Sequence, residues 1–186
     1  MEKTESIRRD SALKRDRREV FYNILLPVWL LLFWPTYLWL LLIPANYLID
    51  RFVLKWSLGE LPERGLFCRK NTWKICLAGF LGDFAGVVLL FGVFMLTGTS
   101  TEDPSFGAFF EKLGYGVGFN PFSHLPAFLV VAASVALAGV VIFFLDRAIL
   151  KKAGLDPEAV KRSALRLALI TAPYLYFFPS AVLYNA

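Results

Sequence analysis

The sequence is poor in the residues on which most catalytic and metal sites are built. Its 186 residues include a single histidine, His124, and two cysteines, Cys68 and Cys76. The spacing of the two cysteines fits neither a disulfide framework nor a pair of metal ligands. The sequence also lacks a glycine-rich phosphate loop and a recognisable Ser/Cys–His–acid set. We therefore expect no metal, no cofactor and no enzymatic activity.

Charged residues are scarce as well. Asp, Glu, Lys and Arg make up 19% of the chain, against about 25% in ordinary globular proteins. Apolar residues reach 57%, and they form long blocks instead of the periodic stripe of a soluble helix. The net charge of +5 is carried beside these blocks, which favours anionic lipid headgroups over nucleic acid as its partner. The composition predicts an all-α membrane protein, most simply of a bacterial inner membrane.

Four apolar blocks are each long enough to cross a bilayer as a helix, which takes about 20 residues. Residues 1–20 precede them with seven Lys/Arg and five Asp/Glu. We expect this charged N-terminal tail to lie on the membrane surface. Residues 21–186 then form a single membrane domain with three to four transmembrane helices. The blocks are residues 21–50, 73–97, 125–146 and 163–185.

The first block is too long for one straight span. Thirty helical residues measure about 45 Å, more than the hydrocarbon thickness, and Pro27, Pro35 and Pro44 interrupt them. Pro35 is the predicted break, because proline removes a backbone donor and kinks a helix. Two forms remain open. A re-entrant hairpin would return to the side it entered, whereas a long kinked helix would cross once.

The distribution of Lys and Arg predicts the orientation of the chain. Segments 51–74 and 147–166 carry six each, the segment between them carries only Lys112, and the last twenty residues carry none. Cytoplasmic flanks collect basic residues. The basic N-terminal tail also favours the cytoplasm, which would require the hairpin form of the first block. The expected topology has loops 51–72 and 147–162 in the cytoplasm, with loop 98–123 and the C-terminus outside.

Two short segments at the ends of apolar blocks resemble each other. Residues 48–55 read LIDRFVLK and residues 144–151 read FLDRAILK. A Pro-Glu pair and another apolar block follow each of them. This pattern favours two parallel copies of a helix–basic loop–helix hairpin, as in some transporters, although the positive-inside rule alone produces similar segments. The residues expected at the cytoplasmic interface are Asp50, Arg51, Lys55, Asp146, Arg147 and Lys151.

Asp83 is the most informative polar residue of the apolar blocks. It lies nine residues beyond Lys74, which on a helix is about 13 Å further into the membrane. A carboxylate at that depth is costly and needs a donor, a proton or a water-filled cavity. It is either a group on an ion pathway or a structural hydrogen-bond acceptor. Its candidate partners within the membrane are Asn46, Ser134, Thr171 and Tyr174.

Small residues predict where the helices pack closely. Ala78, Gly82 and Gly86 recur every four residues and share one helix face. Stripes of this kind let membrane helices approach each other. Ala132 and Ala136 are expected to form the matching face of the third block.

Two functions stay open at this point. The small size, the few polar groups and the basic loops favour an accessory or scaffold subunit of a membrane complex. The repeat and the intramembrane acid favour a small oligomeric channel or an ion-coupled transporter with Asp83 in the pathway. In both cases the expected partners are a bilayer with anionic headgroups and either further copies of the chain or other membrane subunits.

Overall fold

The computed structural model is all-helical within the residues that it describes, which are 27–31, 37, 39–59, 62–98 and 104–184. The charged tail, residues 1–20, lies outside them. In chain order the elements are α2 (Val28–Leu31), α3 (Trp39–Ser57), α4 (Arg64–Thr97), α5 (Pro104–Gly118), η1 (Pro121–Ser123), α6 (Leu125–Lys152), α7 (Pro157–Thr171), η2 (Tyr174–Phe177) and α8 (Ala181–Tyr184).

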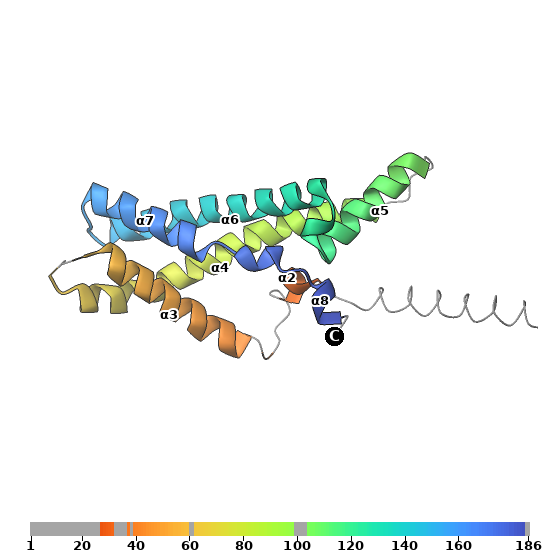
Figure 1. The fold of residues 1–186 in the computed structure, drawn as a ribbon. Coiled ribbons are helices and arrows are strands. Elements are labelled where there is room, and N and C mark those ends of the chain that lie inside the picture. The colour runs from red at the N-terminus through yellow and green to blue at the C-terminus, as the bar shows by residue number, and fades with distance from the viewer. Residues whose placement is uncertain (1–26, 32–36, 38, 60–61, 99–103, 185–186) are drawn as a thin grey trace, which may run out of the picture.

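The two long helices, α4 and α6, pack against each other at the centre of the fold (Figure 1). Both are long and apolar enough to cross a membrane. Only 22% of the most apolar stretch of α4 and 28% of that of α6 are buried, whereas a core helix of a soluble protein would be mostly covered. Large apolar faces of this size are unusual on a protein surface in water. Exposed apolar side chains on the two helices include Leu77, Leu81, Val88, Phe91, Leu129, Leu137, Val140 and Phe144.

Helices α3 and α7 complete a four-helix bundle. α3 contacts α4 and α7, and α6 contacts the same two helices, so the four close into a ring. Arg166 of α7 lies over the ring of Trp56 of α3, 4.4 Å from its centroid. The α3–α4 and α6–α7 turns lie at the same end of the molecule (Figure 1). We call this the basic end, and the opposite end, with α5 and η1, the far end. The residues that define the basic end are Arg51, Lys55, Arg64, Arg69, Lys70, Arg147, Lys151, Lys152, Lys161, Arg162 and Arg166.

The first apolar block is divided into two helical pieces. The indole N–H of Trp29, on α2, donates to the carbonyl of Val117 at the far end, at 3.0 Å. Trp39, which begins α3, stacks on Phe80 near the middle of α4, with 5.7 Å between ring centroids. Trp29 therefore lies farther from the basic end than Trp39. Pro35, the predicted break, lies outside the described residues.

The last apolar block is not one helix. α7 ends at Thr171, shortly before Pro173, because the ring of a proline cannot continue the helical hydrogen bonds. The chain then continues through η2 and α8 to the far end, where the N–H of Ala181 donates to the carbonyl of Phe119 at 3.0 Å. The spanning helix expected over 163–185 is replaced by three pieces that together extend over the length of α6.

Segments expected to be loops are largely helical. α3 continues to Ser57 and α4 begins at Arg64, so the loop expected at 51–72 is reduced to a short turn. The segment 98–123 contains α5, which packs on both α4 and α6 through its glycines. A Cβ atom at Gly116 would clash with Ala127. This contact was not foreseeable from the polar and aromatic composition of the segment.

Candidate functional site

The interior of the bundle has a polar layer between two apolar clusters. The far-end cluster includes Leu90 and Val131, and the basic-end cluster includes Leu54 and Leu150. On each of the two long helices, α4 and α6, an aspartate lies in the turns between the two clusters. α3 contributes a third acid, one turn before its part of the basic-end cluster. The three acids, on three different helices, are Asp50, Asp83 and Asp146.

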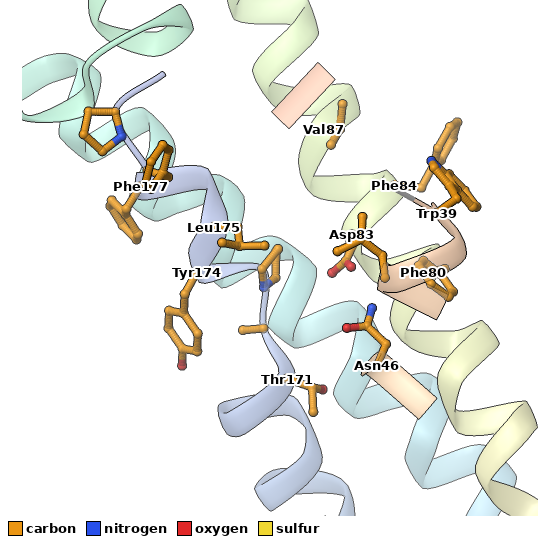
Figure 2. A pocket seen from close by; sticks show the side chains of 15 residues that line it. Trp39, Asn46, Phe80, Asp83, Phe84, Val87, Thr171, Tyr174, Leu175 and Phe177 are labelled. Carbon is orange, nitrogen blue, oxygen red and sulfur yellow. The ribbon is translucent and has the colours of Figure 1, made fainter. Parts of the chain in front are cut away.

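Asp83 opens into a groove of about 760 Å³ between α3, α4 and the segment that follows α7. Figure 2 shows the carboxylate of Asp83 and the amide of Asn46 directed toward the same space. Thr171 lines the groove as well. The three polar residues singled out within the apolar blocks of the sequence thus lie around one cavity. The Oδ1 atom of Asp83 is buried and has no hydrogen-bond partner among the described residues.

Two of the three hydroxyl groups expected to serve Asp83 are engaged elsewhere, and the third, that of Ser134, is buried without a hydrogen-bond partner among the described residues. The Thr171 hydroxyl donates to the carbonyl of Leu167 in its own helix, at 2.9 Å. The Tyr174 hydroxyl donates to the carbonyl of Leu169. The Tyr174 bond supplies a donor to Leu169, because the residue four positions further on is Pro173, which has no N–H. The groove therefore keeps an acceptor, the Asp83 carboxylate, whose donor has to come from outside these bonds.

Six of the fifteen residues that line the groove have aromatic side chains. Trp39 and Phe80 stack with nearly parallel rings, 10° between their planes. Asp83 is the one carboxylate among the described residues that line the groove. None of these lining residues is Lys, Arg or His, so the carboxylate has no basic neighbour in the groove. The groove combines an aromatic wall with one acidic group. The aromatic residues that line it are Trp39, Phe80, Phe84, Tyr174, Phe177 and Phe178.

Asp50 and Asp146 lie deeper in the bundle than Asp83. Asp50 is 4% exposed and interacts with the thiol of Cys76 through a side-chain hydrogen bond. Asp146 is 0% exposed, and neither of its carboxylate oxygens has a hydrogen-bond partner within the described part of the chain.

A buried carboxylate without a donor is costly in a medium of low dielectric constant. Asp146 therefore requires a bound proton, a cation or an ordered water. No group of three His, Cys, Asp or Glu side chains in the described ranges is close enough together to hold a metal ion. The three acids are arranged as separate neighbouring sites along the bundle.

The sequence assigned Asp50 and Asp146 to the cytoplasmic interface, beside basic residues. The structure shows that the two acids face the interior of the bundle while their basic neighbours face outward. The position of these residues at the cytoplasmic interface stays a prediction. Adjacent residues on a helix point in directions about 100° apart, so one can be buried and the next exposed. The exposed basic residues of the set are Arg51, Lys55, Arg147 and Lys151.

The small-residue face of α4 lies against α6. Ala78 is 3% exposed, and a Cβ atom at Gly82 would clash with Ile142 and lie 3.0 Å from the carbonyl oxygen of Ala138. Glycine at this position is therefore what allows the two backbones to approach so closely. This is the helix face that the sequence pattern selected.

The facing side of α6 differs from the predicted one. Ala132 is half-buried and Ala136 is exposed. The residues that meet the glycines of α4 are instead Ser134, Ala138 and Ile142. Alanines occur on several faces of α6, so composition alone did not select the correct one.

Sequence reasoning missed Tyr176, which η2 inserts between α4 and α6. Its side chain is 1% exposed, and its hydroxyl donates to the backbone carbonyl of Asp83 at 2.6 Å. A Cβ atom at Gly86 would lie 3.0 Å from its ring. Tyr176 thereby anchors the chain after α7 to the turn of α4 that carries Asp83. The only sequence signal was the pair of prolines around it, Pro173 and Pro179, which break the last block.

Comparison with known proteins does not add a relative. No protein-family model matches the chain. No curated protein and no solved structure matches it either.

Proposed function

We propose that this chain is a multi-pass integral membrane protein that moves protons or small cations through its helical bundle. Asp83, Asp50 and Asp146 act as successive binding groups in this proposal. The observation that carries it is the presence of three carboxylates on three helices inside one bundle, one of them open to a groove. Ionisable residues within membrane segments are rare and commonly mark ion pathways or proton relays.

The spacing of the three acids supports a pathway toward the basic end. Cys76, the hydrogen-bond partner of Asp50, lies seven residues before Asp83 on α4, about 10 Å along the helix axis. Asn46 is one turn before Asp50 on α3 and lines the groove with Asp83. Asn46 thus offers an amide group between the two acids. Asp146 continues the series, five residues before the basic residue Lys151.

The placement of basic residues supports the proposed membrane orientation. Except for Lys112, the Lys and Arg residues of the described ranges lie on α3, α4, α6 and α7 at or toward the basic end. By the positive-inside rule the basic end faces the cytoplasm of a bacterial inner membrane, and the far end faces out. α4 and α6 cross unbroken in this arrangement. The segments α2–α3 and α7–α8 cross as broken spans, which makes four crossings.

Four crossings place the N-terminal tail outside, and cysteine labelling tests this. In intact cells a membrane-impermeant maleimide is expected to label Asp10→Cys and Lys112→Cys but not Lys152→Cys. Lys152→Cys should react only after the cells are opened, because it lies at the basic end. The wild type is the control, since both native cysteines are buried. If Asp10→Cys were not labelled in intact cells, the tail would lie inside, which contradicts four crossings and supports the hairpin form of the first block.

The two helical hairpins are consistent with a duplication, which we include in the proposal. α3–α4 and α6–α7 are each joined by a short turn at the basic end. The ring of contacts is the one expected if a two-fold axis exchanges the hairpins. Asp50 and Asp146 are both buried, and Leu54 and Leu150 are both 0% exposed.

Ion flux into liposomes tests the proposed function. The purified chain is reconstituted with a pH-sensitive dye inside, and a potassium diffusion potential drives protons inward. Asp83→Asn is expected to lower the protein-dependent flux by about tenfold or more, the factor that corresponds to about 1.4 kcal/mol. Glu111→Gln, an exposed acid on α5, should leave the flux unchanged. Flux that is independent of Asp83 in a correctly assembled protein would contradict the proposal. If the wild type moves no protons, sodium flux is measured instead, with the same variants.

A second function, an accessory or scaffold subunit, is supported by a different surface. A groove of about 460 Å³ on α6 and α7 is apolar, and several of its lining residues are small. Such a surface suits the close approach of a helix from another subunit. Purification in mild detergent, followed by identification of the proteins that copurify, tests this function. The small residues that line this groove on α6 and α7 are Ala136, Gly139, Ala168 and Ala172.

A further inference from the structure

We propose that the groove beside Asp83 binds a lipophilic organic cation, meaning a protonated amine or an onium ion on an apolar body. The inference rests on the proposed function, because it assigns an organic ligand to the same acid, Asp83, that binds protons or small cations in that function. The cationic head would lie against the Asp83 carboxylate, and the apolar body would lie between the aromatic side chains of the groove. The geometry offers three lines of support: charge, shape and the surroundings of the opening.

The charge of the groove selects a cation. Asp83 is its one carboxylate, and no Lys, Arg or His lines it within the described residues. The Oδ1 atom of Asp83 is buried without a hydrogen-bond partner there. An anionic amphiphile would bring a like charge to this acid, and a neutral one would leave its charge without a counterion. A cation satisfies the carboxylate directly, with the amide of Asn46 beside it (Figure 2).

The size and lining of the groove suit an organic ion better than a bare metal ion. Its volume of about 760 Å³ lies within the range of about 300–1,000 Å³ typical of sites for small organic ligands. Aromatic faces attract cations through their ring quadrupoles, most strongly when water is excluded. The stacked pair of Trp39 and Phe80 borders the cavity on the side of α3 and α4.

The surroundings of the opening favour a ligand that arrives from an apolar phase. Leu40 and Leu41, next to Trp39 on α3, are 76% and 69% exposed. On the opposite rim, Leu175 and Phe178 are exposed as well. A lipophilic cation partitions into such surroundings, whereas a hydrated inorganic ion would have to shed its water first.

Binding of tetraphenylphosphonium tests the proposal. The full chain is placed in nanodiscs of zwitterionic lipid, and binding of the radiolabelled cation is measured by equilibrium dialysis against empty nanodiscs. We expect saturable binding to the wild type. Asp83→Asn should weaken it by about tenfold or more, because the variant removes the counterion of the cation. Phe80→Leu should weaken it less, since it removes one aromatic face and leaves the carboxylate in place.

Two controls separate specific binding from partition into lipid. Tetraphenylborate has the same shape with the opposite charge and should not bind saturably. Glu111→Gln, outside the groove, should bind the cation as the wild type does. Equal binding of the cation to wild type and Asp83→Asn, or equal saturable binding of the borate, would overturn the proposal. Ion flux without cation binding would refute this inference alone, and cation binding without flux would refute the proposed function alone.

Discussion

Replacing Gly86 with leucine is expected to lower the free energy of unfolding by about 3 kcal/mol. A Cβ atom at this position would lie 3.0 Å from the backbone oxygen of Ser134 and 3.0 Å from the ring of Tyr176. The Ser134 oxygen belongs to the α6 backbone, and the Tyr176 ring is held by its hydrogen bond to Asp83. Neither neighbour can move aside easily, so a larger side chain would force α4 and α6 apart. Thermal unfolding in mild detergent, followed by tryptophan fluorescence, measures the effect.

Gly92→Leu is the matched control on the same helix. A Cβ atom at Gly92 would meet nothing within 4 Å, and the residue is exposed. This substitution should not lower the unfolding temperature, because it meets no neighbour and leucine has the higher helix propensity. If Gly86→Leu were as stable as Gly92→Leu, the close seam between α4 and α6 would not exist in the folded protein.

Asp146→Asn is expected to reduce ion flux by about tenfold or more without lowering stability. The wild-type carboxylate is 0% exposed and lacks a hydrogen-bond partner among the described residues. An amide of nearly the same shape carries no charge to desolvate, so the unfolding temperature should stay equal or rise. The amide cannot bind and release a proton or hold a cation as a carboxylate does. Flux in liposomes and thermal unfolding are measured on the same preparation.

The two readouts distinguish a functional acid from a structural one. A structural acid would show the opposite pattern, with a lower unfolding temperature and intact flux. Asp50→Asn should behave as Asp146→Asn does, because the two acids occupy equivalent positions in the proposed duplication. Glu158→Gln, an exposed acid on α7, should change neither measurement. Different flux in the two aspartate variants would argue against equivalent roles.

The polar residues of the candidate site were foreseeable one at a time. Asp83, Asn46 and Thr171 stand out because each interrupts an apolar block. That they border a single groove follows from the meeting of α3, α4 and the end of α7. The pairing of α3 with α7 joins segments more than 100 residues apart, and no local pattern predicts it.

The burial of Asp50 and Asp146 could not be predicted residue by residue. Each stands directly before an arginine near the end of an apolar block, which is also the pattern of a polar helix end at a membrane surface. Their burial depends on how α3 and α6 are rotated in the bundle. A difference of one residue, about 100° of rotation, separates the interior from the surface.

Local features of the sequence account for the helical class, the two long apolar helices, the clustering of basic residues and the close-packing face of α4. Each of these follows from composition or from a period within one segment, so no knowledge of the partner helix was needed. Packing between distant segments chose the facing side of α6, buried Asp50 and Asp146, and brought Tyr176 beside Asp83. These outcomes depend on helix rotation and on the break after α7, which contacts across the whole chain select and which no single segment encodes.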